Sequence, residues 1–432
     1  MSGDRWTRQE FLRRAAAAGL TAAGAGQITG AQAAALPPPR RSGIEHVVVV
    51  MMENRSFDHL LGWLPGADGR QAGLTYADAA GAAHPTFALA PDYQGCAYAD
   101  PNHSYEGGRI ALNGGACDGW LRIPGNDPFA IGYYGEADVP FLGAAARYWT
   151  ACDRYFASTM AETFPNRFYL HAAQTDRLHN SLAISRLPTI WDRLAKAGIS
   201  HRYYFSDVPF LALWGARYVP ISRSFQGFLS DCRRGRLPNV SVVEPRLLGE
   251  NPGLSNDDHP HADVRAGQLF LRRVYRAVTT SPNWRRTVLV ITYDEWGGFF
   301  DHVPPAPAAI PSADKAAGNA DGLRGFRVPS LVISPFAQRG AVSHETLDHT
   351  SILRMIEWRW GLDPLTERDA TATNLARVLN LSSPTATTAP LFPAPSRPSV
   401  GCANRAPSEP DKWARLLAKA RRRGWNHAHL PA

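Results

Sequence analysis

The sequence predicts an α/β protein built on a central, mostly parallel sheet with helices on both faces and long loop insertions. Three runs rich in branched apolar residues, at 44–52, 287–293 and 328–334, are typical of parallel strands that are buried on both faces. Helical patterns occupy 262–280 and 349–360. Buried strands that alternate with helices predict a sheet covered on both sides.

Two segments between these elements have the composition of loops. Residues 66–147 and 299–327 are rich in Gly, Pro, Ala and Asn. We expect both to be long loops or insertions that pass over the edge of the sheet. Because long loops in compact domains often carry function, we expect functional residues in them.

The composition indicates a folded protein and argues against a nucleic-acid partner. Hydrophobic residues make up 44% of the 432-residue chain, which is enough for a large core, and the net charge is +8. The basic residues are dispersed, apart from the run Arg421–Arg423. They do not alternate with aromatic residues as in proteins that bind single-stranded nucleic acid.

The five cysteines leave the disulfide pattern open. They form no CxxC pair, which excludes zinc-ribbon and thioredoxin-like motifs. Cys96 and Cys117 flank a loop rich in Gly and Asn and could form a disulfide. The alternative is that all five thiols are free and mostly buried; the other three are Cys152, Cys232 and Cys402.

The N-terminus has the features of an export signal. Arg8, Arg13 and Arg14 precede a weakly apolar run of Ala and Gly, and A-x-A patterns follow at 31–33 and 33–35. The apolar run is too short to span a membrane. Residues 7–12 resemble a twin-arginine signal except at Gln9, where the second Arg is expected. We expect export, into the medium or to the cell envelope; a disordered leader is the alternative.

Acidic residues directly follow two of the predicted strands. Glu53 and Asn54 come after the first strand, and Asp294 and Glu295 come after the second. Ligands of open α/β sheets bind beyond the carboxyl ends of the strands, so we expect these four side chains at one edge. Clustered carboxylates are costly to bury without a cation, and oxygen ligands suit Mg, Ca or Mn. For either pair alone, a helix cap is the alternative.

Thr163 is the candidate nucleophile. It is placed like an N-cap, Pro165 lies in the first turn, and the following residues have helical spacing. The free N–H groups and the positive dipole end of such a helix would stabilise a phosphoryl group and a threonine alkoxide. A hydroxyl attacks poorly unless a cation or a base activates it. A capping role without chemistry is the alternative.

Several histidines next to or close to Asp or Asn in the sequence are candidates for proton transfer. A His beside an Asp would protonate a leaving alcohol or bind a second cation. Caps and surface pairs are the alternatives. The candidates are His103, His259, His261 and the pairs Asp301–His302 and Asp348–His349.

The sequence resembles the bacterial phosphoesterase family, which includes phospholipases C and acid phosphatases and belongs to the alkaline phosphatase superfamily. The resemblance covers roughly residues 44–380 and is carried, in order, by VVVVMMENRSFDHLLG, TFPNR, TYDEWGGFFDHV, VPSLVISPFAQRG and DHTSILRMIEWRWG. It implies an alkaline-phosphatase-like α/β sandwich. It also implies a covalent phospho-enzyme intermediate on Thr163.

The resemblance further implies a set of site residues and a cofactor. The cofactor is a divalent cation, with Ca, Mg, Mn and Zn all open. His103, His259 and His261 are expected to contact the phosphate or to protonate the leaving group. The implied metal ligands are Glu53, Asn54, Thr163, Asp294 and Glu295.

The function expected from the resemblance is that of a metal-dependent phosphoric ester hydrolase of the phospholipase C type. An acid phosphatase acting on small phosphomonoesters is the alternative within the family. A catalytically silent phosphate- or lipid-binding protein is the alternative of another class, and the joint presence of all five implied ligands argues against it. The expected partner is a phospholipid or a small phosphate ester, and the oligomeric state is left open.

Three parts of the chain are expected. Residues 1–41 would be the signal peptide and a linker, 42–381 the phosphoesterase catalytic domain, and 382–432 a Pro-rich tail with a short, basic, amphipathic helix. We favour a helix that docks on the domain and ends at Gly424. Peripheral contact with an anionic membrane surface is the alternative.

Overall fold

The computed structural model describes residues 36–250, 252–384, 387–399, 401–402 and 411–425. Residues 1–35, which carry the predicted signal peptide, lie outside these ranges. Within them, no helix combines the length and the apolar character that crossing a membrane requires.

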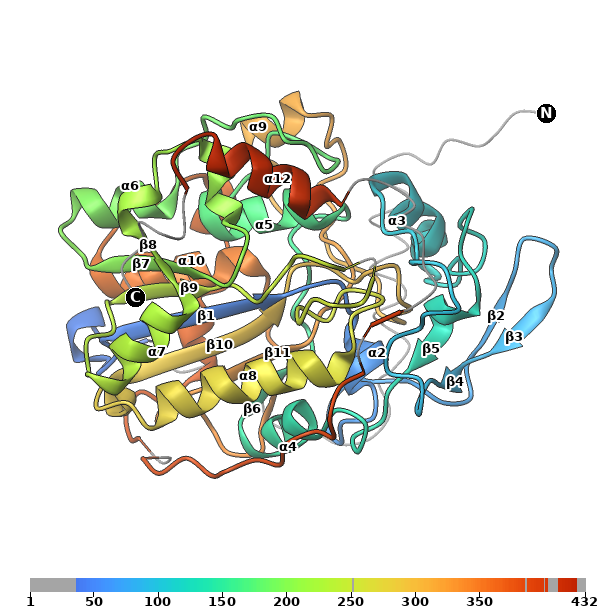
Figure 1. The fold of residues 1–432 in the computed structure, drawn as a ribbon, viewed down its shortest axis with the longest axis horizontal. Helices are drawn as coiled ribbons and strands as arrows, with labels where there is room; N and C mark the ends of the chain where they lie inside the picture. The colour runs from blue at the N-terminus through green and yellow to red at the C-terminus, as the bar shows by residue number, and fades with distance from the viewer. Residues whose placement is uncertain (1–35, 251, 385–386, 400, 403–410, 426–432) are drawn as a thin grey trace. The chain divides into compact units, whose positions relative to one another are not determined.

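A central eight-stranded sheet organises the described part of the chain. Its strands are β1 His46–Met52, β6 Thr150–Cys152, β7 His201–Phe205, β8 Ser222–Ser224, β9 Val240–Val243, β10 Thr287–Tyr293, β11 Ser330–Ile333 and β12 Val342–Ser343. Their order is β12-β6-β11-β10-β1-β9-β7-β8 (Figure 1). β1 lies in the middle and pairs in parallel with β9 and β10, and β9, β7 and β8 continue in parallel. The predicted α/β fold with a mostly parallel sheet is confirmed.

One strand direction differs from the prediction. The run at 328–334 was expected to be a parallel strand like the other two, but β11 pairs antiparallel with both β10 and β6. All four residues of β11 are buried, as are all seven of β1 and of β10. A continuous apolar run reports burial on both faces, which a strand of either direction can have.

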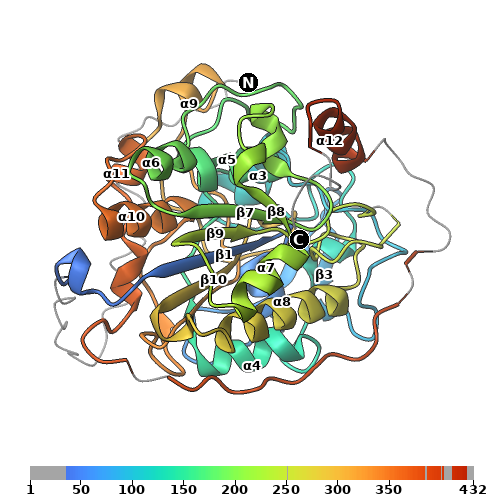
Figure 2. The ribbon, with the colours of Figure 1, turned by 60° about the vertical axis from the view of Figure 1, so that its left-hand side comes forward.

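Helices cover both faces of the sheet, as predicted. The α-helices are α2 Phe57–Leu61, α3 Tyr105–Leu112, α4 Pro140–Tyr148, α5 Thr163–Ala172, α6 Ile190–Lys196, α7 Phe225–Arg233, α8 Val264–Thr279, α9 Ser312–Ala316, α10 His349–Trp360, α11 Glu367–Ala370 and α12 Lys412–Arg421. Short 3-10 helices lie at Pro39–Arg41, Asn113–Gly115, Pro128–Ile131, Phe210–Trp214, Val219–Ile221, Trp284–Arg286 and Leu375–Val378. Figure 2 shows α5, α6 and α10 on one face and α4, α7 and α8 on the other.

The two predicted helices form for visible local reasons. Asp263 caps α8 by accepting a hydrogen bond from the N–H of Arg265, and a buried stripe of Phe270, Leu271, Val274 and Val278 faces the sheet. At α10 the cap is Asp348, and the helix ends at Gly361, which has a left-handed conformation.

The segment 66–147 was predicted to be loop, but it also holds helices and two small sheets. α3 and most of α4 lie in it, together with β2 Thr75–Ala77 paired with β3 Ala83–Pro85, and β4 Phe87–Ala88 paired with β5 Gly132–Tyr133. Some of the glycines that suggested a loop mark close packing instead. A Cβ at Gly108 of α3, for example, would lie 2.5 Å from Met160.

Residues 387–399 of the tail run along the domain past α4 and α8, and α12 lies on the side of the sheet that carries α5 (Figure 2). Tyr275 and Arg272 of α8 donate hydrogen bonds to the carbonyls of Pro390 and Phe392. Further on, α12 buries Trp413, Leu416, Leu417 and Ala420 against the core. The apolar face of α12 is therefore docked on the domain.

A disulfide joins Cys96 to Cys402, which are 306 residues apart. The pairing of Cys96 with Cys117 was wrong, because Cys117 is a buried thiol beside Trp120 and Phe326 in the apolar cluster around α3. Cys152 and Cys232 are also free and buried. The bond fixes the tail to the loop that precedes His103.

Candidate active site

The ends of β1 and β10 form the floor of the site. Parallel pairing sets Met52 opposite Tyr293, so Glu53 and Asp294 leave the sheet side by side. The N–H of Asn54 donates to Asp294 Oδ1 at 3.1 Å. Gly297 approaches the same turn so closely that a Cβ there would lie 2.1 Å from the carbonyl oxygen of Asn54. The two strand ends are thus tied together by a backbone-to-side-chain hydrogen bond and by close packing of their backbones.

Thr163 lies directly above this floor. Its hydroxyl donates to Glu53 Oε2 at 3.3 Å and lies 3.4 Å from Asn54 Oδ1. Thr163 is the first residue of α5 and not its N-cap, which is Glu162. The prediction of the cap was wrong because the hydroxyl turns towards the strand ends, while Asn180 Oδ1 accepts the hydrogen bond of the Phe164 N–H at 2.8 Å.

Arg167 lies one turn further along α5, on the same face as Thr163. Its guanidinium group contacts Glu53 Oε1 at 2.7 Å and Asp294 Oδ2 at 3.1 Å. It also contacts Glu244, the residue that follows β9, at 2.5 Å. Burial alone would lower the pKa of Arg167, but the carboxylates of Glu244, Glu53 and Asp294 raise it well above its usual value. This buried, permanently charged arginine fixes the positions of Glu53 and Asp294 beneath Thr163.

The site carries more acid than its basic residues balance. Burial raises the pKa of Asp294 and Glu295 well above the usual range, and repulsion from Glu53 and between the two raises it further. Burial and the charge of Glu53 likewise raise the pKa of Glu250. Lys412, at the start of α12, contacts Glu250 at 3.2 Å and Glu53 at 3.7 Å.

His103 reaches the site from the loop before α3. Its Nδ1 donates to the carbonyl of Pro101 at 2.8 Å, which directs Nε2 into the site. Nε2 lies 3.3 Å from Asn54 Nδ2 and 3.8 Å from Glu295 Oε1. The side chain is 13% exposed, so it stands between the buried acids and solvent.

His259 and His261 occupy different environments. His259 Nε2 lies 3.6 Å from Glu250 and 3.8 Å from Asp100, and its ring lies 6.2 Å from that of His103. Burial, and then the charge of Lys412, lower the pKa of His259 well below its usual value. The ring of His261 instead contacts the carbonyl of Tyr98 at 3.1 Å and stacks on Phe129. The structure brings His103 and His259 to the acidic cluster, and it places His261 behind it.

The remaining Asp–His pairs have structural partners. Asp301 accepts a hydrogen bond from Arg327 at 2.8 Å, and His302 lies 2.6 Å from Asp58 Oδ2. Asp348 caps α10 and pairs with Arg324 and Arg368. His349 Nε2 donates to the carbonyl of Asp294 at 2.7 Å, so it supports the site from below.

The donor set fits a hard divalent cation. The Thr163 hydroxyl lies within hydrogen-bonding distance of an oxygen atom of Glu53 and of an oxygen atom of Asn54. Glu295 Oε1 is buried and has no hydrogen-bond partner within the described residues. Buried oxygens with an excess of negative charge suit such an ion. A second arrangement, in which ligand atoms of Glu53, Glu250 and His259 lie within 4.8 Å of one another, shares Glu53 and adds a nitrogen ligand.

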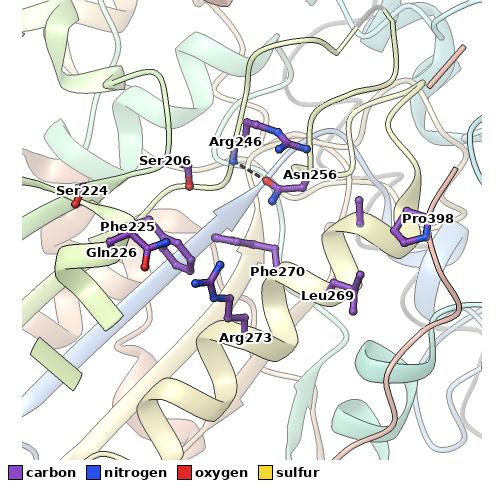
Figure 3. Close-up of a pocket in the computed structure, with 11 residues that line it drawn as sticks. Ser206, Ser224, Phe225, Gln226, Arg246, Asn256, Leu269, Phe270, Arg273 and Pro398 are labelled. Atoms are coloured by element: carbon purple, nitrogen blue, oxygen red, sulfur yellow. Dashed lines mark hydrogen bonds between the residues drawn. The ribbon is translucent and has the colours of Figure 1, made fainter. Parts of the chain in front are cut away.

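Two hollows lie near α5 and α8. One of about 210 Å³ is bordered by Phe164 and Asn180 on one side and by Lys412 and Arg415 on the other, so it opens beside the start of α5. Figure 3 shows another, of about 580 Å³, between Phe225 of α7, Phe270 and Arg273 of α8 and the loop carrying Arg246. Thr163 lines neither hollow, but its neighbour Phe164 lines the first.

Sequence reasoning gave no role to four residues of this cluster. Arg167 is the last residue of the motif TFPNR, and Glu244 directly follows the short apolar run at 240–243. Both therefore had a sequence signal that could have indicated the site. Glu250 and Lys412 had none, because nothing in the sequence shows which loop or tail returns to the sheet edge.

A family model matches most of the chain. The model described as "Phosphoesterase family" matches residues 44–363. The chain is 33% identical over 374 residues to non-specific phospholipase C1 of Arabidopsis thaliana, which covers 76% of this chain and 69% of that protein. It is 33% identical over 488 residues to phospholipase C B of Mycobacterium tuberculosis (strain ATCC 25618 / H37Rv). This alignment covers 92% of the present chain and 88% of that protein.

Similarity to solved structures is much lower. The phosphonate monoester hydrolase of Agrobacterium radiobacter is 11% identical, with a TM-score of 0.38, over 78% of this chain and 77% of that one. A protein in the alkaline phosphatase superfamily from Vibrio parahaemolyticus is 9% identical, with a TM-score of 0.37, over 77% of this chain and 70% of that one. At this level the similarity says nothing about the site.

Proposed function

Because the chain belongs to the phosphoesterase family, we propose that it is a phospholipase C-type hydrolase in which Thr163 attacks the phosphorus of the substrate. Membership of this family makes the protein a phosphoric ester hydrolase. The observation that carries the assignment of Thr163 is its position: a buried hydroxyl at the start of α5, 3.3 Å from Glu53 and 3.4 Å from Asn54.

A divalent cation is part of the proposal. When bound, it would lower the pKa of the Thr163 hydroxyl and offset negative charge on the phosphate. The oxygens around the Thr163 hydroxyl support it, as does Glu295 Oε1, which accepts no hydrogen bond from the part of the chain that the structure describes. The residues that would hold the ion are Glu53, Asn54, Thr163, Asp294 and Glu295.

In the first step Thr163 Oγ1 bonds to phosphorus while the bond from phosphorus to the alcohol oxygen breaks. The hydroxyl proton passes to Glu53 Oε2, which already accepts its hydrogen bond. The departing alcohol oxygen takes a proton from Nε2 of a protonated His103, whose ring is oriented by the carbonyl of Pro101. The products are a phosphothreonine and the free alcohol, which is diacylglycerol if the substrate is a phospholipid.

In the second step a water molecule attacks phosphorus from the side that the alcohol left. His103, now neutral, takes a proton from this water, and Thr163 regains its proton from Glu53 as the phosphate ester departs. His259 is the second candidate for this base, because its lowered pKa keeps the ring neutral near pH 7. We assign no proton transfer to His261, whose ring is engaged with Tyr98 and Phe129.

The substrate class is tested by two chromogenic esters compared side by side. The mature chain would be assayed on p-nitrophenylphosphorylcholine and p-nitrophenyl phosphate, each with and without chelator, and on phosphatidylcholine vesicles for diacylglycerol release. We expect chelator-sensitive cleavage of the choline ester and of the vesicles. Cleavage of the monoester alone would make the protein an acid phosphatase, and binding without any turnover would make it a silent binding protein.

We also propose that the protein is exported. The leader pattern predicts it, and the disulfide between Cys96 and Cys402 is a crosslink of the kind that persists in oxidising compartments. N-terminal sequencing of protein from the medium and the cell envelope tests this. Full-length protein confined to the cytoplasm would refute it.

Contact of α12 with a membrane would be electrostatic. The apolar face of α12 is already buried, while Arg415, Arg421, Arg422 and Arg423 remain exposed. Such a surface favours anionic lipids and weakens with salt. Sedimentation with anionic and neutral vesicles at low and high salt distinguishes this contact from none.

A further inference from the structure

The C-terminal helix α12 reaches the acidic cluster with its first turn. Trp413 is fully buried, its ring lies 5.2 Å from that of Phe164, and its Nε1 donates to Glu250. Asp411 caps the helix by accepting a hydrogen bond from the Trp413 N–H. The start of α12 is therefore fixed against the start of α5, where Thr163 lies.

This docking holds a positive charge beside the proposed nucleophile. Lys412 Nζ lies 3.5 Å from Thr163 Oγ1, 3.2 Å from Glu250 Oε2 and 3.7 Å from Glu53 Oε2. A lysine side chain ordinarily carries its positive charge near pH 7, and here the ammonium group faces the carboxylates of Glu250 and Glu53. The side chain is 22% exposed and borders the hollow of about 210 Å³ beside Phe164. The ammonium group thus has buried acids on one side and open space on the other.

We propose that α12 is part of the active site and that Lys412 binds a non-bridging oxygen of the phosphate group that Thr163 attacks. The inference rests on the proposed function, since it takes Thr163 as the attacking group. A non-bridging oxygen of a phosphoryl group on Oγ1 is only two bonds from that atom, within reach of an ammonium group centred 3.5 Å away. A fixed cation there would bind phosphate and would offset charge as the bond to Thr163 forms.

The segment before α12 is anchored to the loops that carry the other site residues. Cys402 is bonded to Cys96, and its N–H donates to the carbonyl of Pro252, between Glu250 and His259 in the sequence. Ser399 donates its N–H to Asp263 Oδ2 at 2.7 Å. At Ser399 and Cys402 the tail is therefore attached to both loops around the site.

A simpler role must be distinguished from this one. Lys412 could do no more than neutralise Glu53 and Glu250. In that case its removal would leave phosphate binding unchanged and would strengthen cation binding, because a competing positive charge would be gone. If Lys412 binds phosphate, its removal should instead weaken phosphate binding.

The test uses the full chain with Lys412→Met, Lys412→Arg and, as a matched control on the same helix, Lys419→Met. Lys419 contacts the carbonyl of Leu182, away from the acids. Titration calorimetry measures binding of inorganic phosphate and, separately, of Mn²⁺, and thermal melting reports folding. We expect Lys412→Met to bind phosphate about 10- to 100-fold more weakly, the loss of one charge-assisted hydrogen bond. Lys412→Arg should recover most of this affinity, and Lys419→Met should match the original chain.

Kinetics on the choline ester separate the two proposals. If the original chain hydrolyses no ester, the proposed function fails, whereas the phosphate titration still tests Lys412. If the original chain is active and Lys412→Met, with an unchanged melting temperature, binds phosphate equally well or gains only Mn²⁺ affinity, the role of Lys412 is overturned. A Lys412→Met chain that does not fold is replaced by Lys412→Gln, judged by the same phosphate titration.

Discussion

Arg167 Nη1 lies 2.5 Å from Glu244 Oε2, and neither side chain is exposed to solvent. The same guanidinium group contacts Glu53 and Asp294. One arginine of α5 therefore joins the carboxyl ends of β9, β1 and β10, and its position fixes the helix that carries Thr163.

Replacing this arginine should be severely destabilising. Arg167→Met leaves buried carboxylates without their partner, and we expect the free energy of unfolding to fall by about 3–5 kcal/mol. Urea denaturation in the presence of chelator measures it. The control is Arg217→Met, which breaks a surface pair with Asp192 at 2.9 Å and should cost less than about 1 kcal/mol. Equal losses in the two variants would contradict a central role for Arg167.

Replacing the proposed nucleophile, Thr163, should separate turnover from metal binding. We expect Thr163→Ala to lower kcat by about a thousandfold or more, while Mn²⁺ binding, measured by calorimetry, largely survives through the remaining ligands. Thr163→Ser keeps a hydroxyl and should keep part of the activity. Acid quenching during turnover should trap phosphate on the original chain. Substantial activity in Thr163→Ala would rule out the covalent step.

The disulfide should matter for stability and for phosphate binding together. Cys402→Ser removes a crosslink that closes a loop of 306 residues, and we expect a loss of about 2–5 kcal/mol in the free energy of unfolding. Because the crosslink also anchors the tail before Lys412, phosphate affinity should fall as well. Reductant should reproduce both effects in the original chain and change nothing in Cys402→Ser. Reductant effects of equal size in both chains would show that they arise elsewhere.

Glu357 should make stability depend on pH. Burial, and then the carboxyl group of Asp369, raise its pKa to about 9 in the folded protein. A carboxyl whose pKa is raised on folding stabilises the protein below its unfolded pKa, near 4.3, and loses this contribution as the pH rises towards the folded value. The loss is about 1.4 kcal/mol per pH unit between the two values. Glu357→Gln should remove this slope. In urea denaturation at pH 5, 7 and 8, the free energy of unfolding of the variant should therefore rise relative to that of the original chain as the pH rises. Parallel curves would contradict the assignment.

The floor of the site could be predicted because its cause is local. Buried strand patterns at 44–52 and 287–293 end directly in Glu53–Asn54 and Asp294–Glu295, and parallel strands bring such ends to one edge. The position of Thr163 could be predicted for a similar reason, because Pro165 and the helical spacing mark the start of α5. The family resemblance then supplied roles that the pattern alone left open.

What could not be predicted depends on contacts between distant segments. The direction of β11 is set by its neighbours, since a strand buried on both faces has the same composition in either direction. Cys402 is bonded to Cys96 and Lys412 contacts Glu53 and Glu250, although an earlier part of the tail packs against α8. No residue next to Cys402 or Lys412 in the sequence indicates the position of either in the folded protein.

The docking of α12 also bears on how this protein can be handled. A chain shortened to residues 42–381, the catalytic domain expected from the sequence, would lose Trp413 and Trp425. It would uncover Phe164, Phe210 and Phe205, whose rings lie 5.2, 6.5 and 6.1 Å from those two indoles. Uncovered aromatic surface promotes self-association. Trimming the tail would therefore yield an insoluble domain and not a smaller working enzyme.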